Sequence, residues 1–303
     1  MNFRDLEYLI ALEELKHFRK AAEKCFVSQP TLSGQIRKLE DELNVQLMER
    51  SSRKVIFTQA GLDIVAKAKT ILLEAKSLKE IARSYKEPMQ GALHIGLIPT
   101  VAPYLLPVIV PAIKEQFPEL DLYLHEDQTH VLLKQLETGE LDCLMLALLP
   151  EMSALQQYPL YQEPLELALS QTHPWATKST IELEKLRGQR VLMLEDGHCL
   201  RDQAMGFCFA AGAIEDNSFK ATSLETLRHM ISAGHDMTLL PQLAIPVNRH
   251  QAGIRYIPFT APVPSREIGL LCRTNSVRKV CFDTLSKLIS ETVQTKLIQY
   301  QTI

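Results

Sequence analysis

Residues 59–87 are predicted to form one long amphipathic helix, which constrains the fold most because it divides the chain into two differently patterned parts. Apolar side chains recur along it at spacings of four and three, at Ile64, Ala68, Ile71, Ala75, Leu78 and Ala82. Such spacing is typical of a coiled-coil seam. Pro88 and Gly91 end the helix. With under three heptads it is too short to be stable alone, so we expect a dimerising linker.

The composition is that of an ordinary soluble protein of two or three domains, with 303 residues, 46% hydrophobic and 23% charged. No apolar run approaches the ~18 residues of a membrane span, and the start of the chain lacks the features of a signal peptide. Six cysteines without paired spacing indicate a reducing cytoplasm. The chain has no zinc motif and no glycine-rich phosphate loop, so no metal or cofactor is expected.

Residues 5–43 predict three short helices. Leu6, Leu9 and Ile10 form an apolar stripe on the first helix, and residues 18–25 form the second. Ser28 suits the N-cap of the third helix, whose first turn tolerates a proline. The third helix has a predicted buried face at spacings of four, three and four, made by Leu32, Ile36, Leu39 and Leu43.

The opposite face of the third helix is small and polar at its start and basic further on, with Pro30, Thr31, Ser33, Gly34, Arg37 and Lys38. This pattern suits a recognition helix in the major groove of DNA. A basic segment at 50–54 and the run 55–58 then predict a wing on the phosphates. Residues 1–87 hold 16 Lys and Arg against 13 Asp and Glu, whereas the remainder is acidic. The alternatives are a generic helical domain and a solvated basic surface.

We therefore predict two sets of DNA contacts. Near the base edges we expect Gln29, Pro30, Thr31 and Ser33. On the phosphates we expect Arg4, Lys38, Arg50 and Arg53. A head of this kind generally needs a dimer to span two half-sites, which agrees with the predicted seam.

From Ala92 onward strand and helix patterns alternate, which is typical of α/β layers around a mainly parallel sheet. The expected strands are 93–98, 121–125, 142–148, 165–169, 191–194, 237–240 and 267–272. The expected helices are 104–117, 130–138, 200–211, 223–234 and 277–297. Ligands of such sheets lie beyond the carboxyl ends of the strands, so segments 99–101 and 128–130 are candidate pocket walls.

Cys199 stands beside His198 at the predicted start of a helix, with Arg201 nearby. The positive end of a helix dipole, an imidazole and a guanidinium all favour the thiolate. The thiolate is the nucleophilic and oxidisable form of cysteine. The alternative is a buried structural cysteine, since free cysteines are usually buried.

A second thiol, Cys208, follows nine residues later. Nine helical residues separate two Cα atoms by roughly 13 Å, whereas a disulfide needs them within about 7 Å. If the segment is helical when reduced, the two thiols cannot bond until the helix unwinds. Closing so short a loop shifts the balance by about 2.6 kcal/mol in the chain-entropy model, enough to flip a modestly biased equilibrium.

With these residues placed, the whole chain resembles the LysR-type transcription regulators. The resemblance rests on residues 18–40, which include Val27-Ser28-Gln29-Pro30-Thr31, and extends through Arg50 and residues 58–61. Within the family, three further segments are similar to its hydrogen peroxide sensors, namely 96–100, 194–208 and 221–227.

The resemblance implies a fold and a set of partners. It implies a winged helix-turn-helix domain at 1–58, a linker helix at 59–87 and a periplasmic-binding-protein-like regulatory domain at 91–303. That domain would have two α/β subdomains, about 91–162 with 268–303, and about 163–267. The implied protein is a cytoplasmic dimer of dimers that binds double-stranded promoter DNA, hydrogen peroxide and RNA polymerase and is reset by a cellular thiol reductant.

The resemblance also implies that Cys199 reacts with hydrogen peroxide and that Cys208 closes the disulfide. We expect the peroxide to be held and polarised by Thr100, Thr129, His198, Asp202 and Arg266. His198 could equally be a hydrogen-bonded structural residue, and a lone arginine such as Arg266 is more often on the surface. Inert core thiols are expected at Cys25, Cys143, Cys272 and Cys281.

Three functions are compatible with these features. The first, which we favour, is a non-enzymatic regulator of oxidative-stress defence genes that peroxide activates through Cys199 and Cys208. The second is a LysR-type regulator of a small organic effector, whose response would survive Cys199→Ser. The third is a thiol peroxidase, but no reductase-docking signal accompanies the specific helical head.

Overall fold

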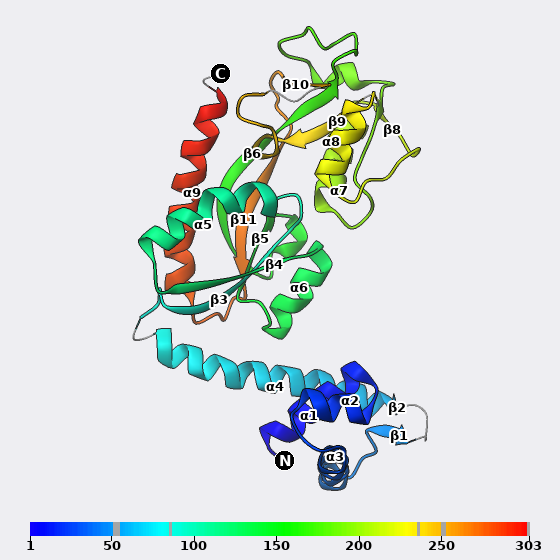
Figure 1. The fold of residues 1–303 in the computed structure, drawn as a ribbon, viewed down its shortest axis with the longest axis vertical. Coiled ribbons are helices and arrows are strands. Elements are labelled where there is room, and N and C mark those ends of the chain that lie inside the picture. The colour runs from blue at the N-terminus through cyan, green and yellow to red at the C-terminus, as the bar shows by residue number, and fades with distance from the viewer. Residues whose placement is uncertain (51–54, 85–86, 235–236, 250–252, 302–303) are drawn as a thin grey trace. The chain divides into compact units, whose positions relative to one another are not determined.

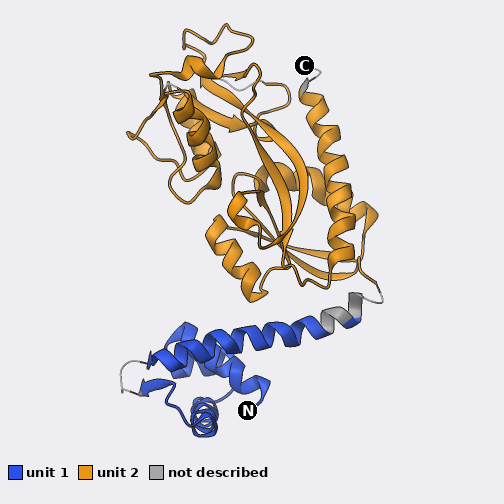
Figure 2. Ribbon diagram, turned by 180° about the vertical axis from the view of Figure 1, so that it is seen from behind, with its two compact units in different colours: residues 1–86 blue, residues 87–303 orange. Residues whose placement is uncertain are grey.

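The computed structural model describes residues 1–50, 55–84, 87–234, 237–249 and 253–301. The chain forms two compact units, residues 1–86 and 87–303 (Figure 2). Each has its own hydrophobic core. No helix within the described ranges is long and apolar enough to cross a membrane.

Unit 1 contains the three predicted helices and the predicted wing (Figure 1). Its helices and strands are α1 (Phe3–Leu15), α2 (Phe18–Lys24), α3 (Gln29–Leu43), β1 (Met48–Arg50), β2 (Val55–Phe57) and α4 (Gln59–Ser84). Strands β1 and β2 pair in antiparallel fashion, so they form the hairpin that the sequence predicts.

Helix α3 begins and ends where its capping residues dictate. Ser28 has extended backbone and its hydroxyl accepts a hydrogen bond from the Thr31 amide at 3.3 Å, as expected of an N-cap. Three of the four predicted apolar residues are buried, but Leu43 is 37% exposed. The prediction was wrong there because α3 ends at Leu43, and Asn44 turns the chain through the left-handed region with φ of 50°.

Helix α4 does not present one continuous seam. Val65 and Ala68 are buried in the core of unit 1, where α4 packs along α1, whereas Leu78 is 67% exposed. The first turns of the predicted coiled-coil seam are therefore used within the same chain. In the later turns Ile71 and Ala75 are half-buried and Leu78 is exposed.

Unit 2 is a mixed α/β fold built on one seven-stranded sheet. Its strands are β3 (Gly91–Leu97), β4 (Leu120–Glu126), β5 (Cys143–Ala147), β6 (Gln156–Ser170), β9 (Met237–Pro241), β10 (Ile254–Pro258) and β11 (Ser265–Cys272). Its helices are α5 (Ala102–Gln116), α6 (Thr129–Thr138), α7 (Cys199–Ala210), α8 (Leu224–Ser232) and α9 (Lys279–Gln301). A separate small pair consists of β7 (Arg190–Val191) and β8 (Ile214–Glu215).

The sheet is not mainly parallel, so that expectation was wrong. Its order is β10-β6-β11-β5-β3-β4, with β9 also paired to β6. Only β4, β3 and β5 pair in parallel, and the other pairs are antiparallel. The reason is that β6 carries the chain out of the first half of the sheet and β11 carries it back beside β6.

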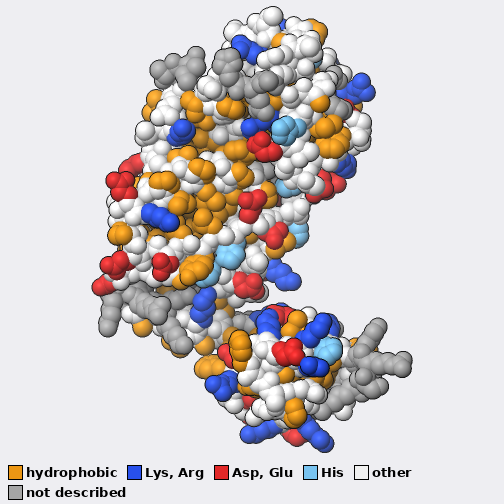
Figure 3. All heavy atoms as spheres, viewed as in Figure 1, with side chains coloured by type: hydrophobic (Ala, Val, Ile, Leu, Met, Phe, Trp, Pro, Cys, Tyr) orange, Lys and Arg blue, Asp and Glu red, His pale blue; other side chains and the backbone are white. Residues whose placement is uncertain are grey.

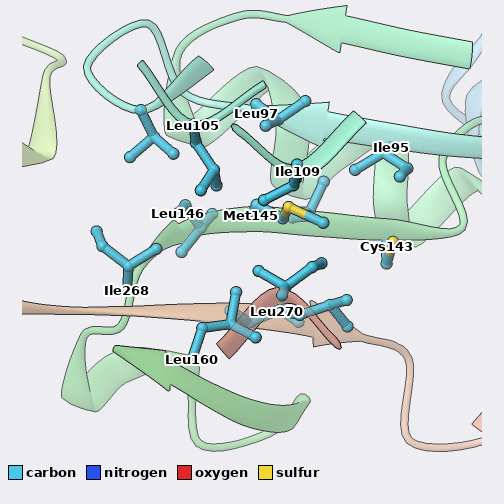
Figure 4. Close-up of a cluster of buried hydrophobic side chains, with 14 of the residues drawn as sticks. Ile95, Leu97, Leu105, Ile109, Cys143, Met145, Leu146, Leu160, Ile268 and Leu270 are labelled. Carbon is cyan, nitrogen blue, oxygen red and sulfur yellow. The ribbon is translucent and has the colours of Figure 1, made fainter. Parts of the chain in front are cut away.

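Unit 2 has two hydrophobic cores. Strand β6 contributes residues to both of them, and β11 contributes to the first. The first core surrounds β3 and β5, and Figure 4 shows Leu105 and Ile109 of α5 packed on it. The second core contains residues of β6, β9 and β10 together with α7 and α8. The two cores correspond to two subdomains that share long strands (Figure 1).

The strand expected at 191–194 is shorter than predicted. Strand β7 ends at Val191, and beyond it only a single bridge joins Leu194 to Ala221. Between them, the Leu192 amide donates to the Met237 carbonyl and the Thr238 hydroxyl donates to the Leu192 carbonyl. These bonds hold the segment at Leu192 next to β9. The chain therefore stops pairing with β8 before it reaches α7.

The divided burial of α4 makes a stability prediction. Ala68→Asp should lower the free energy of unfolding by ~3 kcal/mol or more, because it places an unpaired carboxylate in a packed core. Ala66→Asp, at an exposed position of the same helix, should change it by about 1 kcal/mol or less. Urea unfolding of the full chain checks both values. Equal losses for the two variants would contradict the burial pattern, and sedimentation of Leu78→Asp separately reports the oligomer.

Candidate redox site

Cys199 is the first residue of α7, and the loop before it packs closely against a neighbouring segment. His198 is the N-cap, and Gly197 has φ of 97°, a conformation that side chains other than glycine rarely adopt. A Cβ at Gly197 would lie 2.7 Å from Oε1 of Gln128. The loop before Cys199 therefore lies against Gln128, the residue that precedes α6.

The two candidate thiols are buried in different cores. Cys199 is 6% exposed and belongs to the first core, whereas Cys208 is 2% exposed and belongs to the second. Nine residues at 100° each also place them on opposite faces of α7, with a rise of roughly 13 Å. Both thiols are free. The expectation that a helix separates them is confirmed, since α7 spans Cys199–Ala210.

Burial controls the ionisation of Cys208. Desolvation raises the pKa of this thiol to about 12, because a thiolate is poorly solvated inside an apolar core. Cys208 is thus held as the neutral thiol in the folded protein at neutral pH. A reaction that needs the Cys208 thiolate requires that it first leave the second core.

Arg266 lies fully buried in a network that joins three elements. Its Nε donates to Glu163 Oε2 at 2.8 Å, and its Nη1 and Nη2 donate to Thr100 Oγ1 and the Thr100 carbonyl, each at 2.9 Å. Glu163 Oε1 accepts the Leu243 amide at 3.1 Å. All three side chains are at most 2% exposed. The structure therefore brings together Thr100 and Arg266, which the sequence predicts, and adds Glu163, which it does not.

Thr129 begins α6, and its hydroxyl is buried without a partner in the described part of the structure. Thr129 follows β4 and Thr100 follows β3, and these strands are parallel neighbours. The Asp127 amide donates to the Leu97 carbonyl at 3.3 Å, which keeps the two strand ends together. Gln128, the residue before Thr129, lies against Gly197 in the loop that precedes Cys199. The unpaired Thr129 hydroxyl is therefore one residue along the chain from that contact.

The remaining predicted residues lie in different environments. His198 is buried at 5% exposure, whereas Asp202 is exposed on the first turn of α7. Arg201 is buried and engaged by Asp196 at 2.9 Å and by Glu215 Oε2 at 3.2 Å. Lys220 and then Arg201 lower the pKa of Asp196. The Arg201 guanidinium thus ties the loop before α7 to β8.

Two further contacts link the subdomains. The Tyr104 hydroxyl of α5 donates to Glu225 of α8 at 3.1 Å. The Tyr300 hydroxyl of α9 donates to the Ile245 carbonyl at 3.0 Å. Burial and then the Glu225 charge raise the pKa of Tyr104 well above its usual range, so the phenol stays protonated and remains a donor.

Most of the residues predicted to contact DNA are exposed on α1 and α3 of unit 1. Exposed side chains are Arg4, Gln29, Pro30, Thr31 and Lys38. Ser33 is half-buried on the same helix. The backbone of Arg50 ends β1, but its side chain and all of Arg53 lie outside the described residues.

The other cysteines differ in burial. Cys25 is half-buried after α2, whereas Cys143, Cys272 and Cys281 are buried in the first core. Burial raises the pKa of all four thiols. Within the described residues, no cluster of three or more His, Cys, Asp or Glu could hold a metal ion.

Two sequence profiles cover most of the chain. The profile of the bacterial regulatory helix-turn-helix protein, lysR family, matches residues 3–62. The profile of the LysR substrate binding domain matches residues 86–294. The chain belongs to the LysR family of transcriptional regulators.

Among relatives of this LysR-family regulator is the DNA-binding transcriptional dual regulator OxyR of Escherichia coli K12. The two are 58% identical over 289 residues, which cover 95% of each chain. The full-length OxyR C199D structure from Pseudomonas aeruginosa is 37% identical, has a TM-score of 0.75, and aligns over 95% of this chain and 94% of its own. The oxidised form of OxyR is 52% identical, with a TM-score of 0.64 over 69% of this chain and 98% of its own.

Because Arg266 and Glu163 form a buried ion pair, we expect that removing one partner strongly lowers the free energy of unfolding. Arg266→Met should lower the free energy of unfolding by about 3–5 kcal/mol, because it leaves the Glu163 carboxylate buried without its cation. The double variant Glu163→Gln/Arg266→Met should recover part of that loss. Urea unfolding measures all of them, with the exposed Arg255→Met as control. A single-variant loss below about 1 kcal/mol would contradict the network.

The raised pKa of Cys208 predicts how its alkylation depends on pH. In a reduced Cys199→Ser variant, iodoacetamide should modify Cys208 at least ~10³ times more slowly at pH 8 than an unperturbed thiol of pKa about 8.5. Below the folded pKa of about 12 the thiolate fraction rises tenfold per pH unit, so the rate should still climb between pH 8 and pH 10. Peptide mass spectrometry measures the rate, and circular dichroism checks folding. A plateau near pH 9 would contradict the burial argument.

Proposed function

We propose that this chain is a transcription regulator that hydrogen peroxide activates through a reversible Cys199–Cys208 disulfide, and that it controls oxidative-stress defence genes. The observation that carries the proposal is the position of the two thiols at opposite faces of α7 and in different cores. The relatives' names support it, since one from Pectobacterium carotovorum, 57% identical over 294 residues, is called a hydrogen peroxide-inducible genes activator.

In the first step the Cys199 thiolate attacks one oxygen of hydrogen peroxide. An S–O bond forms, the O–O bond breaks, and the departing oxygen leaves as hydroxide that is protonated to water. The site offers donors for that developing charge. Thr129 has an unpaired buried hydroxyl, and Thr100 accepts from Arg266 at 2.9 Å, which leaves its own hydrogen to donate outward. His198, the residue before Cys199, is a further candidate donor, whereas the Asp202 carboxylate could hold the peroxide only by accepting one of its hydrogens.

In the second step the Cys208 thiol must reach the Cys199 sulfenic acid. An S–S bond forms and water leaves, but the helical rise of roughly 13 Å forbids this until α7 unwinds. Unwinding removes Cys208 from the second core and lowers the cost of its ionisation. Oxidation is thereby coupled to a change in the fold, which a regulator can transmit to DNA. A cellular thiol reductant would reverse it.

The head is proposed to bind promoter DNA as part of a dimer of dimers in the cytoplasm, where it would contact RNA polymerase. The later turns of α4 support one self-contact, since the apolar side chain of Leu78 is 67% exposed within the chain. A second apolar area, over α5, supports a second self-contact. Figure 3 shows hydrophobic side chains gathered over α5, where Leu106, Val108 and Val110 are only partly buried.

A footprinting experiment tests the proposed function. Purified protein on the DNA upstream of its own gene should change its protected region after one equivalent of peroxide and revert with dithiothreitol. Cys199→Ser should keep the reduced footprint under peroxide. Cys208→Ser should still consume peroxide but fail to give the full change. If Cys199→Ser responds like the parent chain, the thiol is incidental and an organic effector becomes the better explanation.

The DNA contacts have their own test. Ser33→Asn should abolish recognition of the site while the protein stays folded, because the longer amide disturbs the surface that faces the bases. Arg50→Ala should weaken binding to all sequences and reduce the slope of log K against log salt by about one. Fluorescence anisotropy over a salt series measures both, with Lys287→Ala on α9 as an exposed control. Unchanged binding by both variants would overturn the assignment.

A further inference from the structure

Cys143 and Cys272 are opposite each other on neighbouring strands of the sheet. Strands β5 and β11 are antiparallel, and the register pairs Cys272 with Cys143 at the end of the ladder. Both residues are completely buried in the first core, and Figure 4 shows Cys143 at one end of that cluster. The proposed peroxide mechanism uses neither thiol.

The hydrogen bonds of the ladder determine which kind of pair this is. The Leu148 amide donates to the Glu267 carbonyl at 2.8 Å, so Leu148 and Glu267 are a hydrogen-bonded pair one step before the ladder. Hydrogen-bonded and non-hydrogen-bonded pairs alternate along antiparallel strands. Five steps further on, Cys143 and Cys272 are therefore a non-hydrogen-bonded pair.

Non-hydrogen-bonded pairs bring two strands closest at the side chains. Their Cα atoms are about 4.5 Å apart, within the range of about 4.4–6.8 Å that disulfides require. Both side chains are on the same face of the sheet because they are directly opposed. In contrast to Cys199 and Cys208, this pair needs no unwinding before it can bond.

We propose that Cys143 and Cys272 form a second dithiol, which hydroperoxides close to a cross-strand disulfide while the fold of unit 2 is retained. The Cys272 thiolate attacks the hydroperoxide, so that an S–O bond forms, the O–O bond breaks and the departing oxygen is protonated to the hydroxyl compound, which is water when the oxidant is hydrogen peroxide. Cys143 then attacks the Cys272 sulfenic acid, so that an S–S bond forms and one water leaves. The net reaction converts two thiols and one hydroperoxide into a disulfide, water and the corresponding hydroxyl compound.

The order and the slowness of the reaction follow from burial. Desolvation raises the pKa of Cys272 to about 11 and that of Cys143 further above its usual range. Cys272 is also the last residue of β11, and Thr274 and Asn275 beyond it are exposed. Cys272 is therefore the residue that local opening at the strand end would bring to the oxidant, far more slowly than Cys199 reacts.

A third thiol makes the proposal specific. Cys281, in the first turn of α9, is close enough that its charge, with that of Cys272, raises the pKa of Cys143. Cys281 is a helix residue without a cross-strand partner, so the register favours Cys143 as the one that resolves Cys272. Arg266 is the second residue of β11 and Cys272 is its last, so the disulfide would leave the Arg266 site unchanged.

The experiment uses the full chain with Cys199→Ser and Cys208→Ser, so its result does not depend on the proposed peroxide switch. The folded protein is incubated with excess hydrogen peroxide, quenched with an alkylating agent in acid, and mapped by mass spectrometry. We expect two free thiols to be lost and the peptides that contain Cys143 and Cys272 to be linked. Adding Cys281→Ser should leave the link intact, whereas adding Cys272→Ser should abolish it.

Thermal unfolding gives a second measurement on the same samples. The linked protein should melt several degrees higher than its reduced form, because the bond closes a long loop of the unfolded chain. The Cys272→Ser protein should show no such rise. A link that involves Cys281, or oxidation of Cys272 to sulfinic acid without any link, would overturn the proposal.

Discussion

The geometry of α7 is the constraint on which the proposed switch depends. A helix of this length holds Cys199 and Cys208 on opposite faces and commits each to a separate hydrophobic core. Forming the Cys199–Cys208 disulfide therefore requires that α7 unwinds and that at least one of the two thiols leaves its core. Closing the loop is worth about 2.6 kcal/mol in the chain-entropy model, so oxidation can reverse a modestly biased two-state balance instead of adding a crosslink to an unchanged structure.

The buried network around Arg266 has a complementary role. A guanidinium without solvent is tolerated only when its charge and donors are satisfied, and Glu163 and Thr100 do both. Arg266 and Glu163 lie on the paired strands β11 and β6, and β6 contributes residues to both cores, so the network lies where the two cores adjoin. The same network orients the Thr100 hydroxyl. The network is thus a fixed set of hydrogen-bond donors, whereas the proposed switch requires the residues around α7 to rearrange.

Local patterns predicted much of this architecture, and the exceptions have physical causes. Ser28 and the apolar spacing of α3 predicted its start and buried face, because capping and periodicity are local properties. The direction of β6 and β11 could not be predicted, since pairing depends on where the chain returns after about 100 residues. Glu163 was missed because a lone acid on a strand has no local signal, and its role exists only through Arg266. The first turns of the α4 seam are buried because α4 packs along α1. The apolar spacing within α4 carries no information about that contact.

Amide hydrogen exchange measures whether oxidation unwinds α7. The reduced protein and the protein treated with one equivalent of peroxide are compared peptide by peptide, with the disulfide mapped in the same digests. We expect a 199–208 disulfide, a loss of protection across 200–210, and unchanged protection in α5 and α9. A 199–208 disulfide with α7 still protected, or a disulfide between other cysteines at this dose, would contradict the proposed switch.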